Sequence, residues 1–337
     1  MNVERTNNRY ICFDILKAIC AFMVVCIHKS FIFAEEEIRV ICRIAVPIFF
    51  MISGFFYEEL KRKNKIKEQI LKIFKLFVFF SIFYALYLII RNACNGIEIK
   101  DYLSSVFTTG NLFCLLLFNY HPLTVLAWYL SALLYTIIIV NFVSSKLNKK
   151  ILYFISPLLL IIGVIFGAYS DKLLNLSIPL AYTRNFLFEG IPFYSIGMYF
   201  YSIKNKLNNI NINICLIFIL CFAGLSIFEY YLLTKSNNVT GDIFFSTVIL
   251  AISVFILFYK LYENKNINKL DITLSEIGKS YSMGIYFIQI MVRDILDIVM
   301  NKLNIINYYS YIAPIMIYLC CIMLIYLYKK VIKRSVL

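Results

Sequence analysis

Ten long apolar runs follow one another along the chain, and each is long enough to cross the roughly 30 Å hydrocarbon layer of a membrane as a helix. The mean hydropathy of +0.80 and the 15% content of charged residues agree with this pattern. The chain is therefore predicted to be an all-α, polytopic membrane protein with one domain over 1–337. The expected spans are 10–33, 38–57, 70–91, 125–144, 151–168, 183–202, 212–233, 241–262, 277–300 and 308–328.

Basic residues are distributed unevenly between alternate connections of these spans. The termini and the connections on their side hold 21 of the 33 Lys and Arg residues, whereas the opposite connections hold seven. Basic residues favour the cytoplasmic side, so both termini are predicted to be cytoplasmic. The segment 102–118 is too short and too polar for a regular span, and it is expected to be interfacial or re-entrant. One more crossing there would invert every later span.

Several function classes have no support in the sequence. The net charge of +14 follows from the basic connections of a membrane protein and does not indicate a nucleic-acid partner. The ten cysteines lie mostly in apolar runs and lack the CxxC spacing of zinc or redox sites. The H-E-x-x-H, Walker and G-x-S-x-G motifs are also missing from the sequence. No metal site is therefore predicted.

The first span carries Asp14, Lys17 and His28. Ten residues separate Lys17 from His28, which places them on the same face of a helix, roughly 16 Å apart along its axis. Ionisable side chains inside a membrane are costly and mark a functional site by default. Lys17 and His28 are therefore expected to line one tunnel and to contact two parts of an extended ligand. Alternatively, Asp14 and Lys17 form an i,i+3 interfacial ion pair, and His28 is a hydrogen-bonded packing residue.

Other spans are expected to bring polar groups to the depth of His28. Arg43 lies about five residues below the outer end of the second span, and Glu189 and Arg293 reach a similar depth in later spans. Gln289 is expected near the middle of the membrane. Polar groups gathered in one layer fit an enclosed reaction chamber. An ion-pair network that only joins helices gives the same pattern.

Three short motifs also have structural explanations. Ser53-Gly54 fits small-residue helix packing as well as a catalytic role. Trp128-Tyr129 fits an aromatic belt at the membrane surface better than a site. His121-Pro122, in the long outer connection 92–124, is expected to be a turn.

The polar residues of these spans stand in segments that resemble the integral-membrane acyltransferase type 3 family, which includes bacterial O-acetyltransferases of surface polysaccharides. Phe13–Lys17 and Val24–His28 together resemble the family's basic-x10-His signature. Val46–Phe55 resembles its phenylalanine-rich motif ending in Ser-Gly-Phe. The remaining similar segments follow in the family's order and are Trp128–Leu130, Phe188–Phe193 and Ser282–Gln289.

The resemblance implies a membrane O-acyltransferase of the bacterial cytoplasmic membrane. It would move an acyl group, most simply acetyl from cytoplasmic acetyl-CoA, to a hydroxyl of a surface glycan or lipid-linked saccharide. His28, Arg43 and Glu189 are the predicted catalytic residues, with His28 as general base or transient acyl carrier. The residues expected to contact the acyl donor are Asp14, Lys17, Ser53, Tyr286 and Gln289. Many members have histidine where this chain has Gln289, and glutamine cannot carry a proton.

One alternative of a different class stays open. A transporter of a small polar solute, such as an amino acid, would also keep charged side chains in the bilayer along its pathway. Solute uptake without any acyl donor would identify a transporter, and an acyl-CoA-dependent product would identify a transferase. A non-catalytic scaffold is a third interpretation, which the number of charges inside the spans disfavours.

Overall fold

The computed structural model describes residues 11–122, 125–207, 209–234, 243–262 and 267–335, and the regular structure in these residues is helical, with no strand. The predicted all-α, multi-pass fold is confirmed. Contacts divide the chain into two units. Unit 1 comprises Met1–Ala45, Asn205–Cys221 and Leu250–Leu337, and unit 2 comprises Val46–Lys204 and Phe222–Ile249. Four basic residues that contributed to the predicted orientation, Arg5, Arg9, Lys235 and Lys265, lie outside the described residues.

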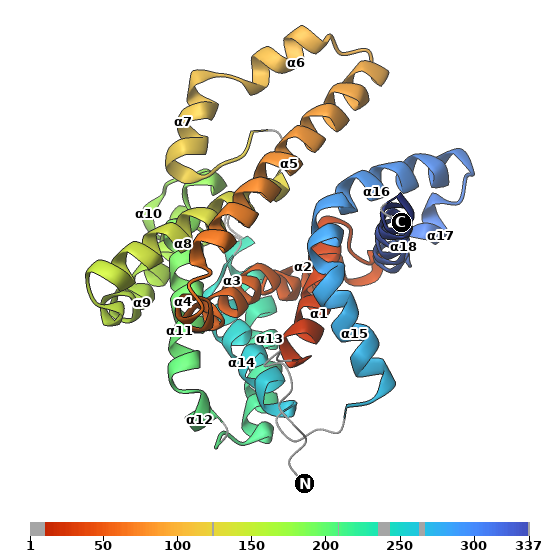
Figure 1. The fold of residues 1–337 in the computed structure, drawn as a ribbon. Helices are drawn as coiled ribbons and strands as arrows, with labels where there is room; N and C mark the ends of the chain where they lie inside the picture. Colours follow the sequence, from red (N-terminus) through yellow and green to blue (C-terminus); the bar gives the residue numbers. More distant parts are fainter. Residues whose placement is uncertain (1–10, 123–124, 208, 235–242, 263–266, 336–337) are drawn as a thin grey trace. The chain divides into compact units, whose positions relative to one another are not determined.

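Unit 1 is built around its first helix. α1 packs against α2, α15, α16 and α18 (Figure 1). The main helices of the unit are α1 (Ile11–His28), α2 (Glu35–Cys42), α15 (Lys269–Ser280), α16 (Ser282–Lys302), α17 (Ile306–Ser310) and α18 (Ala313–Ser335). Three further helices, α12 (Lys204–Leu207), α13 (Ile212–Thr234) and α14 (Phe245–Leu261), are divided between the two units.

The contact between α1 and α15 is unusually close. A Cβ atom at Gly278 would lie 1.6 Å from the carbonyl oxygen of Asp14, so only glycine permits this approach of the two backbones. On another side of α1, the hydroxyl of Tyr318 donates a hydrogen bond to the carbonyl of Ala18 at 3.0 Å. The sequence predicted a cytoplasmic connection over 260–276, but in the structure the helix α15 begins within this segment, at Lys269. These contacts fix the half of α1 that carries Asp14 and Lys17.

Unit 2 contains a second close helix pair. The helices of unit 2 are α3 (Ala45–Phe55), α4 (Tyr57–Arg62), α5 (Ile66–Cys94), α6 (Ile99–Val106), α7 (Thr109–Phe118), α8 (Trp128–Lys146), α9 (Lys149–Phe166), α10 (Ser170–Leu174) and α11 (Ile191–Ser202). Only the first residue of α3, Ala45, belongs to unit 1. α3 and α11 touch backbone to backbone, because a Cβ at Gly54 would lie 1.9 Å from the Tyr194 carbonyl oxygen and one at Gly197 would lie 2.0 Å from that of Met51. The long helix α5 leads into α6 and α7 (Figure 1).

Fewer helices than the ten predicted are long and apolar enough to cross a membrane. Within the described residues there are seven, which contain α1, α2 to α4 as one segment, Ile32–Arg62, and α5, α8, α9, α13 and α18. An eighth is possible where the expected interfacial or re-entrant segment forms α6 and α7, which meet at 46°. Three expected spans fall short: α11 has 12 residues, α14 has 17, and α16 carries several charges. Residues 241–242 of one expected span lie outside the described residues. The orientation of the termini stays a prediction.

Candidate active site

α1 carries the titratable residues of the first predicted span. Asp14 is buried and accepts a hydrogen bond from Nζ of Lys17 at 3.4 Å, while the Lys17 side chain is 29% exposed. His28 is partly buried and is the last residue of the helix. Because α1 is uninterrupted, Lys17 and His28 lie roughly 16 Å apart along its axis. The predicted i,i+3 ion pair is present, and the Lys17 side chain is partly exposed.

The helices α1 and α2 pack against each other, and the buried thiols of Cys26 and Cys42 lie close together in this contact. His28 follows Cys26 by two residues, and Arg43 follows Cys42 directly as the C-terminal cap of α2. The structure therefore brings together the two helix ends that carry His28 and Arg43. A turn at Arg43 and Ile44 separates α2 from α3 within one candidate span, and this turn was not predicted.

α16 packs along the half of α1 that lies between Lys17 and His28. The two helices share a buried apolar cluster with α18, and Gln289 lies on the same buried face of α16, one turn after Ile285 and one turn before Val292. Lys17, Gln289 and His28 therefore all lie on the two helices that meet in this contact. The members of the cluster are Ala21, Val25, Ile285, Val292, Ile317 and Cys321.

Gln289 holds a buried acceptor that has no hydrogen bond in the described part of the chain. The residue is 1% exposed, and its Nε2 donates to the carbonyl of Tyr286 at 3.1 Å. Its Oε1 is buried and meets no donor among the described residues. An unsatisfied buried amide oxygen costs about 1–3 kcal/mol, so a ligand N–H or O–H that reached it would be stabilised.

Charged residues of α16 surround the end of α1. Nη1 of Arg293 donates to the backbone carbonyl of His28 at 3.4 Å, and its Nη2 lies 2.7 Å from Asp294. Lys29, next to His28, pairs with Asp297 at 3.1 Å. The sequence placed Arg293 at this depth but did not predict the roles of Asp294 and Asp297. The available signal was the three charges within about one helical turn of an apolar span.

Ser53 and Glu189 belong to unit 2. Oγ of Ser53 donates to the carbonyl of Phe49 in its own helix at 2.9 Å, and the adjacent Gly54 provides the close contact with α11. The surroundings of Ser53-Gly54 are thus those of a helix-packing motif, the structural alternative noted from the sequence.

Glu189 lies in a π-helical turn, Phe186–Gly190, which precedes α11. Asn119 fixes this turn, because its Oδ1 accepts a hydrogen bond from the N–H of Phe186 at 2.8 Å. The Glu189 side chain is buried and lines a cavity of about 10 Å³, with room for about one water molecule. The other residues around the cavity are Leu160, Gly163, Val164, Gly167, Thr183, Phe188 and Ile243. π-helical turns often occur at functional sites, and this one was not predicted.

The Trp128-Tyr129 pair packs against the phenylalanine-rich motif of α3. Both residues are buried, and the ring of Tyr129 lies 5.0 Å from that of Phe50. The guanidinium of Arg184 lies 5.4 Å from the Trp128 ring centre. The prediction of an aromatic belt is therefore wrong for these two residues, because their side chains pack inside unit 2.

The second of the chain's two histidines is a packing residue of unit 2. His121 is buried, and its Nε2 forms a hydrogen bond of 2.9 Å with Oγ of Ser81. Burial lowers the pKa of His121 to about 4, so the ring is neutral at physiological pH. The side chain at the expected His121-Pro122 turn is thus buried, and it joins the segment that follows α7 to α5.

Comparisons with known proteins agree with the sequence motifs. The model of the acyltransferase domain family matches residues 10–329. Among curated proteins, an amino-acid racemase of Enterococcus faecalis is 26% identical over 302 residues, which cover 83% of this chain and 40% of that protein. The chain thus spans less than half the length of that relative. No solved structure matches. The match over nearly the whole chain shows that this protein belongs to the acyltransferase type 3 family.

Proposed function

We propose that this protein transfers an acyl group, most simply acetyl, from acyl-CoA to a hydroxyl of a surface glycan or lipid-linked saccharide in a bacterial cell membrane. Membership of the family supports a membrane acyltransferase. The observation that carries the finer proposal is the placement of His28 at the end of the helix that also bears Lys17, with the amide of Gln289 on the adjoining helix. A donor with a long, flexible arm and an anionic end suits this arrangement.

The donor would lie along α1 in this proposal. The ammonium of Lys17, on a partly exposed side chain, would contact its polar or phosphate-bearing portion. The buried Oε1 of Gln289 suits an amide N–H, of which the pantetheine arm has two. The thioester would then reach His28. Tyr286 lies on the same helix, and its carbonyl accepts the hydrogen bond that positions the Gln289 amide.

His28 would act as general base. Its neutral imidazole would take the proton of the acceptor hydroxyl as that oxygen attacks the thioester carbonyl carbon. The C–O bond forms, the resulting tetrahedral oxyanion collapses, the C–S bond breaks, and the coenzyme A thiolate leaves and takes up a proton. Arg43, on the adjoining helix end, would stabilise the oxyanion or hold the acceptor. A transient acyl-imidazole is the alternative route through the same residue.

Arg293 supports this role of His28 as a positioning residue. Its hydrogen bond to the His28 carbonyl fixes the last residue of α1, where carbonyl groups lack helical partners. Glu189 has a less direct role in this proposal. It is a buried carboxylate in unit 2 that would hold an acceptor hydroxyl or a water molecule in its cavity.

The role of His28 can be tested against His121, the other histidine of the chain, as a matched control. The purified protein in liposomes is given acetyl-CoA with a labelled acetyl group and a membrane glycan extract, and transfer of label is measured. His28→Gln is expected to lower transfer at least a hundredfold, because general-base catalysis contributes about 10²–10⁴ in rate. His121→Gln is expected to retain transfer, because the glutamine amide can still bond to Ser81. Full transfer by His28→Gln and His28→Ala would refute the assignment.

A further inference from the structure

The segment that follows His28 in unit 1 carries exposed apolar side chains. A short 3₁₀ turn, Ile32–Ala34, comes after α1, and in it Ile32 is 54% exposed and Phe33 is 69% exposed. We call residues 31–33 the apolar loop. A candidate membrane span, Ile32–Arg62, begins in this loop. The apolar loop is therefore expected at the boundary of the membrane, close in sequence to the proposed base.

A line of aromatic contacts within unit 1 holds the apolar loop in place. The ring centre of Phe33 lies 5.5 Å from that of Phe31. The ring of Phe31 lies 6.5 Å from that of Phe22 in α1, which in turn lies 5.3 Å from that of Tyr318 in α18. The hydroxyl of Tyr318 donates to the carbonyl of Ala18 in α1. Because the loop is joined to two helices in this way, the exposure of Phe33 is a fixed feature of unit 1.

Polar side chains surround the end of α1 just before the apolar loop. Arg293 bonds to the carbonyl of His28 and to Asp294. Lys29 pairs with Asp297, whose side chain is 32% exposed. A carboxylate has about four lone-pair sites, so Asp297 can accept hydrogen bonds from hydroxyl groups as well as from Lys29. The two carboxylates also balance the two cations, so this group of side chains suits the uncharged hydroxyls of a saccharide, which both donate and accept hydrogen bonds.

We propose that the acceptor is a lipid-linked saccharide whose hydrocarbon chain contacts the apolar loop while its saccharide lies at the end of α1. The inference rests on the proposed transferase function and narrows its acceptor from surface glycans in general to an amphiphile. Ile32 follows His28 by four residues, so the polar and apolar parts are at most about 14 Å apart. One saccharide lipid spans this distance, and burial of its chain against Ile32 and Phe33 contributes affinity. A water-soluble glycan would contact only the polar part.

A simpler explanation is that the apolar loop contacts ordinary membrane lipid. Apolar and aromatic side chains are common at the boundary of a membrane and need no special ligand. Helix α9 of unit 2 provides a comparison, because Phe154 is 76% exposed and Ile155 is 39% exposed. If the apolar loop only contacts bulk lipid, the pair Ile32 and Phe33 should behave like the pair Phe154 and Ile155.

The first test identifies the lipid that touches the apolar loop. A photoreactive benzoylphenylalanine is placed at Phe33 or, as the control, at Phe154 of the full-length protein in membranes of the native host. After illumination, the attached lipids are identified by mass spectrometry. We expect saccharide lipids to be enriched at least tenfold at position 33 over position 154, where bulk phospholipid should dominate. The same lipids in the same proportions at both positions would overturn the proposal.

The second test measures the preference between two acceptors. Saccharide lipids are extracted from host cells that lack the gene, and water-soluble saccharides are released from part of the extract. Transfer of labelled acetyl to each is measured with the protein in liposomes, and the ratio of the two kcat/KM values gives the preference for the lipid-linked form. The double variant Ile32→Ser with Phe33→Ser is expected to lower this preference at least tenfold, because less apolar surface is buried.

Two further double variants separate this effect from a general loss of apolar surface. Phe154→Ser with Ile155→Ser removes an exposed apolar pair elsewhere, and Ile32→Leu with Phe33→Leu keeps the apolar loop apolar. Both are expected to keep the preference of the unaltered protein. An unaltered protein with no preference for the lipid-linked form, or a serine variant of the loop that keeps it, would contradict the proposal.

Failure of this acceptor site and failure of the transferase proposal have different signatures. Enrichment of saccharide lipids at position 33 without any acetyl transfer would leave the lipid site standing and would refute the transferase function. Transfer that depends on His28 but shows no preference for the lipid-linked form would support the transferase function and would refute the lipid site.

Discussion

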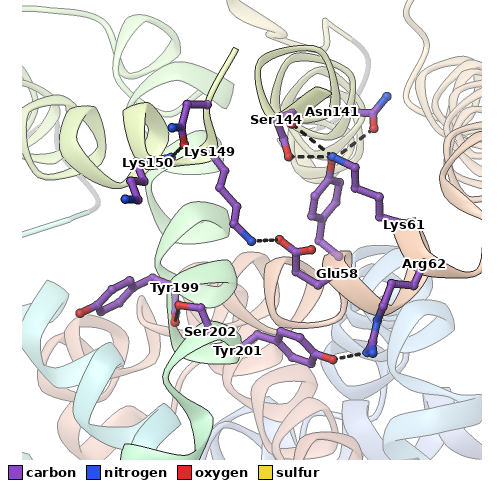
Figure 2. A network of polar contacts seen from close by, with 12 residues as sticks. Glu58, Lys61, Arg62, Asn141, Ser144, Lys149, Lys150, Tyr199, Tyr201 and Ser202 are labelled. Atoms are coloured by element: carbon purple, nitrogen blue, oxygen red, sulfur yellow. Dashed lines mark hydrogen bonds and ion pairs between the residues drawn. The ribbon is translucent and has the colours of Figure 1, made fainter. Parts of the chain in front are cut away.

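The end of α1 in unit 1 and the ends of α4, α8, α9 and α11 in unit 2, which meet through Glu58–Lys149, Lys61–Ser144 and Arg62–Tyr201, hold their charges in different ways (Figure 2). In unit 1 three cations near the proposed site have a carboxylate beside them, in the pairs Lys17–Asp14, Lys29–Asp297 and Arg293–Asp294. In unit 2 the carboxylate of Glu58 pairs with Lys149, whereas the cations of Arg62 and Lys204 both contact the ring of Tyr201.

The difference teaches what each set of charges is suited to do. Paired charges that are partly buried fix the positions of helix ends, because breaking a pair leaves a charge without its partner. Such fixed ends suit a reacting group such as His28, which must be held in place. Arg62 and Lys204 instead lie over the ring of Tyr201, whose negative face attracts a cation. The ion pairs of unit 1 thus suit a site of chemistry, whereas the cation–ring contacts of unit 2 join the ends of α4, α11 and α12.

The largest expected effect comes from separating α1 from α15. Gly278→Ala would place a Cβ 1.6 Å from the Asp14 carbonyl oxygen, so α15 must move away and the paired charges of α1 lose their support. We expect loss of monodisperse protein in size-exclusion chromatography and of transfer activity. Gly224→Ala in α13 is the control, since its Cβ would meet nothing within 4 Å and alanine favours a helix. Equal behaviour of the two variants would mean that the contact does not hold unit 1 together.

A change of about tenfold in KM for acetyl-CoA is expected at Lys17, because this paired cation would also bind the donor. Lys17→Gln removes the ammonium that the donor would contact, so KM for acetyl-CoA should rise, whereas kcat should change much less. Lys17→Arg keeps the charge and should restore KM. Steady-state kinetics with varied acetyl-CoA decide this prediction. A fall in kcat alone would place Lys17 in the chemistry and not in donor binding.

A smaller effect is expected on stability, and it distinguishes the two regions directly. Asp297→Asn removes the carboxylate partner of Lys29 and should lower the free energy of unfolding by about 1 kcal/mol, because the pair is partly exposed. Arg62→Gln should leave the apparent Tm within error, since Arg62 has no described carboxylate partner. Thermal unfolding followed by fluorescence-detected chromatography compares them. A larger loss for Arg62→Gln would mean that its contact with Tyr201 stabilises the fold more than the ion pair of Lys29 and Asp297 does.

The smallest effect is a pH dependence in unit 2. The folded-state pKa of His121 is about 4, below the ordinary value of 6.5, so the unfolded chain binds more protons between these values. Stability is then complete above pH 6.5 and falls as the pH drops toward 4. Between pH 7 and pH 6 the loss should be about 0.7 kcal/mol. His121→Gln should lack this slope, and an unchanged slope would assign it to another group.

The sequence predicted the features that depend on hydropathy and on helical spacing. The apolar runs predicted the all-α membrane fold, and the ten-residue interval placed Lys17 and His28 on one helix, α1. The motifs also predicted the family, which the match over residues 10–329 bears out. These features follow from the order of residues within single helices.

Features that depend on contacts between helices were not predictable in the same way. Gly278 gave no signal of a backbone contact with Asp14, because glycine has no side chain whose pattern could be read. The contact of Cys26 with Cys42 joins two different helices, α1 and α2, so it depends on how the chain turns between them. The π-helical turn at Glu189 depends on Asn119, which lies in a different connection.

The most direct test of the central claim is mass spectrometry of cell-envelope glycans from the native host. Cells with the intact protein, with the gene deleted, and with His28→Ala at equal expression are compared. We predict that an acetyl-sized mass increment on one glycan is present with the intact protein and is lost in both altered strains. Glycans that are the same in all three strains would contradict the account, and so would an increment that persists with His28→Ala.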